Sequence, residues 1–100
     1  MSWATRHITE LQAGRTVQFR PRGNSMSGKV ESGQLCTVEP VEPDTLRKGD
    51  IVLCKVSGRQ YLHLIAAVNG QRFLIGNNRG HTNGWVGANG IFGRLARVEP

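Results

Sequence analysis

The sequence has few cysteines and no long apolar run, and each absence excludes a class of protein. Cys36 and Cys54 are the only two cysteines among 100 residues. Without metal-ligand spacing they argue against a zinc site and predict buried free thiols in a reducing compartment. No stretch approaches the roughly twenty apolar residues of a membrane-spanning helix, and residues 1–14 lack the apolar region of a secretory signal. We therefore expect a cytoplasmic protein that is not inserted in a membrane.

Acidic residues are also scarce. Seven Asp and Glu stand against thirteen Lys and Arg, which gives a formal charge of +6 at pH 7. This balance favours acidic partners such as nucleic acid or an acidic protein surface. The basic residues are scattered, however, so a basic surface without a particular ligand explains the charge equally well. No Asp or Glu lies between Asp50 and Glu99, which leaves that half of the chain without a carboxylate.

Glycine is abundant, and it divides the chain into short segments. Thirteen glycines and four prolines with only six aromatic residues predict many short strands joined by turns. Residues 4–13 carry the apolar spacing of a short helix, which Thr5 or Ser2 could cap and Gly14 would end. A chain of this length makes a single domain, in which we expect an N-terminal helical segment over 1–14 and a β body over 16–98.

After residue 15 the apolar period changes from helical to two, which indicates strands. Residues 51–56 are apolar at almost every position and predict a central strand. Asn69-Gly70 predicts a type I′ hairpin, and residues 76–84 read as a long polar loop. The pattern predicts a mainly β, rolled or barrel-like fold with one short N-terminal helix. The predicted strands are 16–20, 35–38, 51–56, 60–68, 71–75 and 91–98.

A basic, glycine-rich turn over residues 20–28 carries Ser25 near its tip. Such a turn exposes the serine hydroxyl and leaves nearby backbone N–H groups free, as a nucleophile and its oxyanion hole require. Asn24, Met26 and Ser27 complete this candidate oxyanion loop. Serine and glycine are also ordinary turn residues, so the pattern alone leaves open that Ser25 only shapes a loop.

His63 lies in the middle of a predicted strand. Period two places it on one face with Tyr61, while Leu62 and Leu64 point to the other, core-like face. We therefore expect His63 to face outward or into a groove beside the sheet. Histidine suits a general base near neutral pH, but a strand histidine is also a common packing residue, and spacing alone does not bring His63 to Ser25.

Six short motifs follow one another in an order that resembles a serine peptidase clan. The clan holds the LexA-type repressor peptidases and the type I signal peptidases, and the resemblance covers about residues 16–98. The motifs are Gly23-Asn24-Ser25-Met26, Gly33, Val38-x-Pro40, Gly49-Asp50-Ile51-Val52, Tyr61-Leu62-His63 and Gly76-Asn77-Asn78-Arg79.

The resemblance implies a role for several residues. Ser25 matches the nucleophile, and its backbone N–H would be one oxyanion donor. His63 matches the general base in the histidine form of endoplasmic-reticulum-type signal peptidases. Asn77, Asn78 and Arg79 match the box that braces the site, although Asn77 stands where the pattern has Asp. Loss of an orienting acid typically costs several orders of magnitude in rate.

The resemblance implies a stand-alone, soluble, minimal peptidase-like domain of the kind found in phage or mobile-element contexts. The first hypothesis is a serine endopeptidase that binds an extended peptide or protein segment beside a strand edge and needs no cofactor. Arg20, Arg22 and Lys29 would surround the site and favour acidic or phosphorylated ligands.

The second hypothesis is a catalytically inactive module of the same fold. It would bind protein or nucleic acid through a basic surface formed by Arg20, Arg22, Lys29 and Arg79. In that case Ser25 is only a turn residue and His63 only a packing residue.

Overall fold

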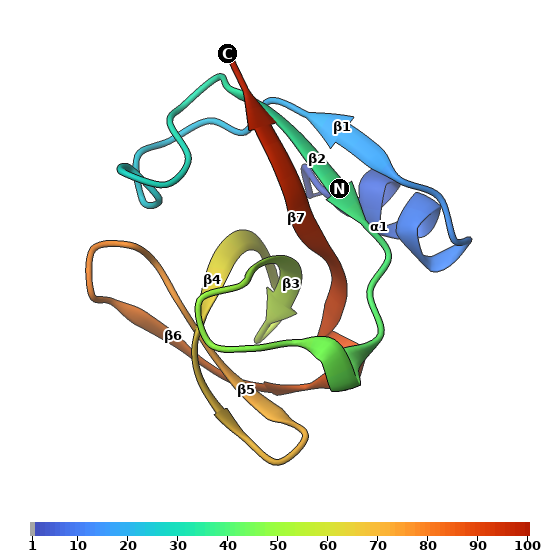
Figure 1. Ribbon diagram of the computed structural model, residues 1–100, viewed down its shortest axis with the longest axis vertical. Helices are drawn as coiled ribbons and strands as arrows, with labels where there is room; N and C mark the ends of the chain where they lie inside the picture. Colours follow the sequence, from blue (N-terminus) through green and yellow to red (C-terminus); the bar gives the residue numbers. More distant parts are fainter. Residues whose placement is uncertain (1) are drawn as a thin grey trace.

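The structure is a computed structural model that describes residues 2–100. Seven antiparallel strands form one sheet in the order β1-β2-β7-β3-β4-β5-β6 (Figure 1), and one short helix packs beside it. The mainly β fold with a single N-terminal helix is therefore confirmed. The elements are α1 (Thr5–Gln12), β1 (Val17–Phe19), β2 (Leu35–Glu39), η1 (Pro43–Thr45), β3 (Ile51–Val56), β4 (Arg59–Asn69), β5 (Arg72–Gly76), β6 (Thr82–Gly87), η2 (Ala88–Gly90) and β7 (Ile91–Glu99).

The sheet curls because its long strands change partner along their length. The first part of β7 pairs with β3 and its remainder pairs with β2. In the same way, β4 pairs with β3 up to Leu64 and with β5 from Leu64 onward. Four of the strand pairs contain a register shift, and such bulges bend a strand. The end strands β1 and β6 pair with one neighbour each, so the sheet is rolled without closing into a barrel.

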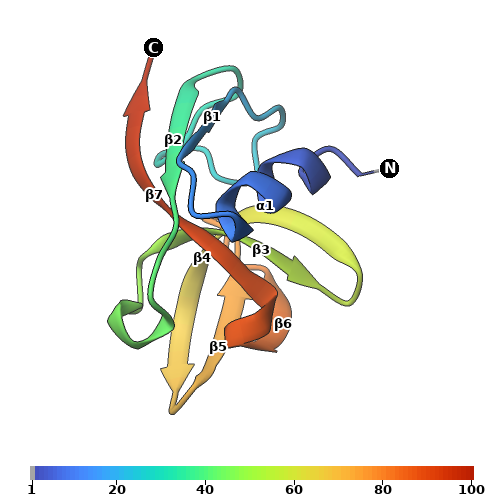
Figure 2. The same cartoon turned by 90° about the vertical axis from the view of Figure 1, so that its right-hand side faces the viewer.

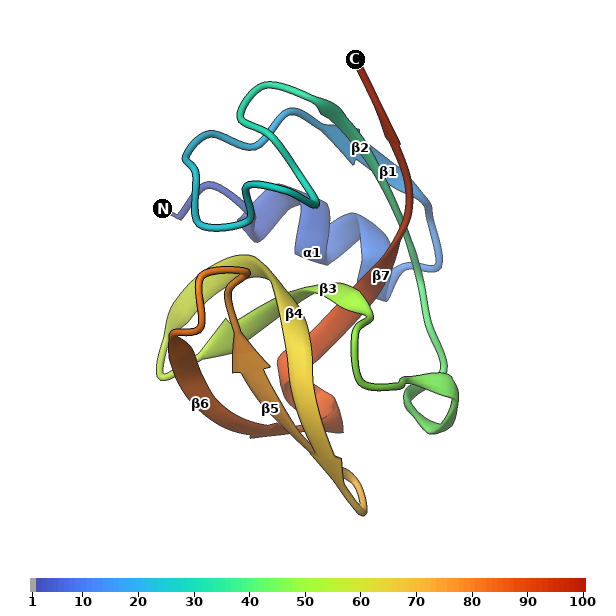
Figure 3. The same ribbon diagram turned by 60° about the vertical axis from the view of Figure 1, so that its left-hand side comes forward.

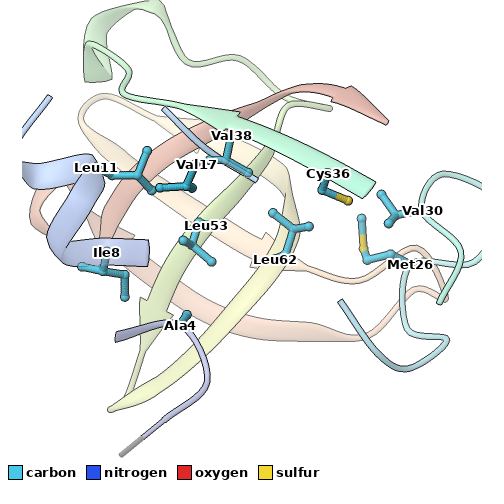
Figure 4. Packing of buried hydrophobic residues seen from close by; sticks show 10 residues of the cluster. All are labelled: Ala4, Ile8, Leu11, Val17, Met26, Val30, Cys36, Val38, Leu53 and Leu62. Carbon is cyan, nitrogen blue, oxygen red and sulfur yellow. The ribbon is translucent and has the colours of Figure 1, made fainter. Parts of the chain in front are cut away.

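The curl creates two apolar clusters, one on each face of the β3–β4 hairpin. Leu53 and Leu62 belong to the first cluster (Figure 4), which also receives the apolar face of α1. Val52 and Ile65 belong to the second cluster, enclosed by β5, β6 and β7. This arrangement explains why 51–56 is apolar on both faces: β3 is a central strand, as predicted, with a core on either side.

Helix α1 lies across the opening between the β1–β2 pair and the β3–β4 hairpin (Figures 2 and 3). It ends as expected at Gly14, whose φ of +86° allows the Arg15 N–H to donate to the Glu10 carbonyl at 3.0 Å. The expected N-terminal cap was wrong. The residue before the helix is Ala4, and its N–H donates at 2.8 Å to Oε1 of Gln60 on β4. A side chain distant in sequence therefore caps this helix.

Two predicted connections differ from the structure. Asn69 pairs with Arg72, so the β4–β5 turn is Gly70–Gln71, with Gly70 at φ +60°. A positive φ at the first central position alone fits a type II′ turn, not the expected type I′ turn on Asn69-Gly70. The expected loop over 76–84 is also shorter, because Thr82–Gly84 belong to β6 and pair with β5. An end strand needs few apolar side chains, so its pattern resembles a loop.

Gly93 on β7 offers a test of the packing between α1 and the sheet. A Cβ added there would lie 2.7 Å from the Glu39 carbonyl oxygen, 2.8 Å from Cγ1 of Val38 and 3.0 Å from Cδ2 of Leu11 on α1. We expect Gly93→Ala to lower the free energy of unfolding by about 1–3 kcal/mol, because backbone and core atoms must move. Urea denaturation followed by circular dichroism measures the change.

Gly87→Ala is the matched control, since a Cβ at this strand glycine meets nothing within 4 Å. We expect it to change the free energy of unfolding by less than about 0.5 kcal/mol. Equal effects of the two substitutions would contradict the close packing described at Gly93.

Candidate active site

Ser25 lies in the β1–β2 connection, which is anchored by its own apolar side chains. Met26 and Val30 are buried, with 5% and 4% of their surface exposed, and both pack beside Cys36 (Figure 4). The Val30 N–H donates to the Met26 carbonyl at 2.8 Å. The residue directly after the serine is therefore fixed in the core, which holds the backbone of Ser25 in place.

The structure brings Ser25 and His63 together. The Ser25 Oγ lies 3.2 Å from Nε2 of His63, which is hydrogen-bond distance for a serine hydroxyl and a histidine base. His63 lines a cleft, as the groove alternative expected, but only 7% of its surface is exposed. The expectation of one core-like face on this strand was incomplete, because β4 has an apolar cluster on each side.

Asn83 provides the third member of this arrangement, and the sequence did not identify it. Its Oδ1 lies 2.7 Å from Nδ1 of His63. An amide oxygen only accepts a hydrogen bond, so Nδ1 carries the proton and the lone pair of Nε2 faces Ser25. The missing carboxylate is thus replaced by a neutral group with the same orienting effect. Asn83 was hidden from pattern analysis because it falls in the stretch that was expected to be a loop.

The surroundings keep the imidazole of His63 neutral. Burial lowers the pKa of His63 from 6.5, the hydrogen bond with Asn83 raises it, and the nearby His81 lowers it, with a net downward shift. A neutral imidazole can accept a proton from a serine hydroxyl, whereas an imidazolium cannot. His63 is therefore in its base form at neutral pH.

The turn between β5 and β6 holds the serine loop from the other side. The Asn78 backbone N–H donates to the Ser25 carbonyl at 3.0 Å, and Nδ2 of Asn78 donates to the Ser27 carbonyl at 2.8 Å. Gly28 has a φ of +95°, which favours glycine, and a Cβ there would also press on Nδ2 of Asn78 at 3.1 Å.

Asn77 shapes this turn and, within residues 2–100, makes no hydrogen bond to the serine loop. Its Oδ1 accepts hydrogen bonds from the backbone N–H groups of Arg79 and His81, at 2.9 and 3.0 Å. Arg79 is exposed. Of the three residues expected to brace the site, Asn78 is the one that touches it.

Two backbone N–H groups remain available beside the serine hydroxyl. Within residues 2–100, the N–H groups of Ser25 and Met26 have no hydrogen-bond acceptor. The N–H of Ser27, by contrast, donates to the Asn24 carbonyl at 3.2 Å. The N–H groups of Ser25 and Met26 are therefore the better candidates to hold an oxyanion, and that of Ser27 is already engaged.

A cleft of about 420 Å³ extends from Ser25 and His63 along one edge of β4. Four consecutive residues of that strand, 60–63, line it, and they pair with β3 alone because β5 pairs only from Leu64 onward. Arg20 and Arg22 also line the cleft, whereas Lys29 is not among the lining residues. The unpaired strand edge and the candidate catalytic residues thus share one cleft.

The two cysteines lie outside this cleft. Both are buried free thiols, and burial raises the pKa of Cys54 to about 12, so that thiol is a poor nucleophile. Within residues 2–100, no group of three or more His, Cys, Asp and Glu side chains could hold a metal ion. The one α-helix in the same described part is too short and too polar to cross a membrane.

Comparison with known proteins supports the resemblance drawn from the motifs. A family model described as Peptidase S24-like matches residues 4–95, a span that includes α1 as well as the sheet. Neither the curated proteins nor the solved structures contain a match to this chain. Because the family model covers nearly the whole sequence and agrees with the order of the motifs, the chain belongs to the Peptidase S24-like family.

Proposed function

We propose that this protein is a serine endopeptidase in which Ser25 is the nucleophile, His63 the general base and Asn83 the group that orients the base. The observation that carries the proposal is the continuous line of contacts from the Ser25 Oγ through both ring nitrogens of His63 to Oδ1 of Asn83. Membership of the Peptidase S24-like family supports it.

The proposed reaction begins when His63 Nε2 takes the proton of the Ser25 hydroxyl as Oγ attacks a peptide carbonyl. The C–N bond then breaks, the leaving amine receives the proton from His63, and an acyl-enzyme ester remains on Ser25. Water, activated by His63, hydrolyses this ester and restores the serine. The N–H groups of Ser25 and Met26 would stabilise the negative oxygen in both tetrahedral intermediates.

An extended substrate segment would bind along the free edge of β4. Val56 and Arg59 pair with each other across a two-residue turn. The main-chain N–H and C=O groups of Arg59, and of every second residue after it, therefore point to β3, whereas those of Gln60 and Leu62 point away from it. Those of Leu62 are directly next to His63. Pairing with them as an added strand would place a substrate carbonyl beside Ser25.

Covalent labelling of Ser25 tests the proposal without a known substrate. We expect a small fluorophosphonate to label the wild type and not Ser25→Ala, because only an activated hydroxyl displaces fluoride at a useful rate. Trypsin should release the modified fragment 23–29, and fragmentation must place the label on Ser25, since Ser27 lies in the same fragment. The exposed Ser2 provides a control, and Ser2→Ala should be labelled like the wild type. Unlabelled wild type would argue for the non-catalytic alternative.

The pH dependence of labelling tests the roles of His63 and Asn83. Protonated His63 cannot act as a base, so the wild-type rate should fall on acidification with a midpoint below 6.5, in the direction of the lowered pKa. Asn83→Asp places a carboxylate at Nδ1, which favours the imidazolium and should move this midpoint upward by about 1–3 pH units. Asn83→Leu should slow labelling at least about tenfold, because the ring loses its preferred tautomer.

Asn89→Asp is the matched control for the charge, because Asn89 is an exposed asparagine in η2. It should leave the pH midpoint unchanged. The titration of the His63 ring protons, followed by NMR, gives the same comparison without a reaction. An unchanged His63 pKa in Asn83→Asp would exclude the proposed contact in solution.

The charge of the cleft favours an acidic residue in the substrate. Arg20 and Arg22 line the cleft with one carboxylate, that of Glu31, which accepts a hydrogen bond from the Gly28 N–H at 2.7 Å. Within residues 2–100, neither arginine forms an ion pair with a carboxylate. Two peptides are compared that differ only in carrying Asp or Lys next to the cleaved bond. We expect Arg22→Glu to lower the ratio of their kcat/KM values, Asp over Lys, by up to about fivefold, which is the scale of an exposed charge pair. The same substitution at Arg72, which is exposed on β5 and does not line the cleft, should preserve the ratio. A ratio that also stays constant in Arg22→Glu would show that the cleft does not read charge.

A further inference from the structure

Trp3 is the most exposed large apolar side chain of the described residues, yet it is held in place. Its exposed fraction is 49%. The indole Nε1 donates to the Gln60 carbonyl at 3.4 Å, and the ring meets Phe19 edge-on at a centroid distance of 5.4 Å. An anchored aromatic ring with half its surface open differs from a side chain that has merely failed to find a core, and it is typical of binding surfaces.

The open surface of Trp3 belongs to the cleft that holds Ser25 and His63. Trp3 and Gln60 both line this cleft, and Gln60 stands three positions before His63 on β4. Three residues of an extended strand span about 10 Å. Trp3 is therefore placed to meet a side chain about three residues from the bond that Ser25 would attack.

The cleft offers apolar surface at Trp3, beside a Gln60 side chain whose polar groups are already engaged. Pro21 and Leu62 line the cleft together with Trp3, and Trp3 supplies the largest exposed apolar side chain, because Leu62 is only 6% exposed. The side chain of Gln60 is already engaged, because its Oε1 accepts from Ala4 N–H at 2.8 Å and its Nε2 donates to Oγ1 of Thr5 at 3.0 Å. The side chain of Gln60 therefore offers no further partner to a polar group that lies on Trp3, whereas an apolar side chain gains by burial against the ring.

Trp3 also limits how far a bound segment can pair with β4. The Gln60 carbonyl points away from β3, toward the place of an added strand, but the indole N–H already occupies it. Main-chain pairing can therefore use Leu62, while beyond that point the segment meets the ring of Trp3.

From these contacts we infer that Trp3 forms the wall of a specificity subsite that selects a large apolar side chain, such as Leu, about three residues from the cleaved bond. The inference rests on the proposed peptide-binding role of the cleft, and it names the class of peptide that the cleft takes. The loop that carries Ser25 and the segment that precedes α1 build this subsite together.

Binding to Ser25→Ala tests the subsite separately from catalysis. Fluorescein-labelled eight-residue peptides of alternating Ala and Ser, with one Leu placed at each position in turn, are titrated with this variant and followed by fluorescence polarisation. We expect the best Leu position to bind about tenfold more tightly than the all-Ala/Ser parent, which corresponds to the burial of one large side chain.

In the double variant Ser25→Ala/Trp3→Ala, the preference for the best Leu peptide over the all-Ala/Ser parent should fall to less than about twofold. The double variant Ser25→Ala/Trp3→Leu should retain part of this preference. Trp85→Ala on the Ser25→Ala background is the control, because Trp85 is similarly exposed at 43% but does not line the cleft. It should leave the preference unchanged. Circular dichroism verifies that each variant is folded.

Two results would overturn the inference: the absence of saturable binding for every Leu peptide, or a Leu preference that persists without Trp3. Failure of the proposed catalysis looks different. In that case the fluorophosphonate leaves Ser25 of the wild type unlabelled, while the Leu preference and its loss in Trp3→Ala are still observed.

Discussion

The contact between the Ser25 hydroxyl and the His63 imidazole depends on how firmly the β1–β2 loop is held against the sheet. The loop is attached on two sides. Met26 and Val30 are buried in the first apolar cluster, and Asn78 of the β5–β6 turn holds the carbonyls of Ser25 and Ser27. A loop held only by hydrogen bonds at its surface would leave the serine side chain free to rotate away. Burial of the residue directly after the serine restricts the backbone where the geometry is most sensitive.

Much of this arrangement follows from the sequence, because local patterns determine it. The apolar run of β3, the glycine that ends α1 and the change of period after residue 15 each predict their element correctly. Ser25 and His63 could be named from the order of short motifs. Their distance could not be predicted, because it depends on the curl of a sheet whose strands exchange partners, and register shifts of this kind leave no clear signal in one sequence.

The residues that the sequence did not identify share a physical feature: each acts through a contact between distant elements. Gln60 caps α1 from β4 across 56 positions, and Asn83 reaches His63 from an end strand that lacks an apolar pattern. The sequence has no carboxylate between Asp50 and Glu99, but the amide oxygen of Asn83 accepts the same hydrogen bond. An orienting group needs an oxygen that accepts a hydrogen bond from the histidine ring at the right position. Whether that oxygen also carries a charge is a separate property.

That separation explains how a neutral group can serve in this site. A carboxylate beside His63 would favour the charged imidazolium and would itself lose hydration next to a buried ring, a cost that a charge pair only partly recovers. Asn83 orients the ring without bringing a charge next to it. Because burial already lowers the pKa of His63, the base is neutral before any substrate arrives. The consequence for the proposed reaction is asymmetric: His63 starts as the neutral base, but an imidazolium formed during the reaction would receive less stabilisation than a carboxylate would give. In the proposed reaction, this design would sacrifice part of the maximum rate and would keep the base neutral at lower pH.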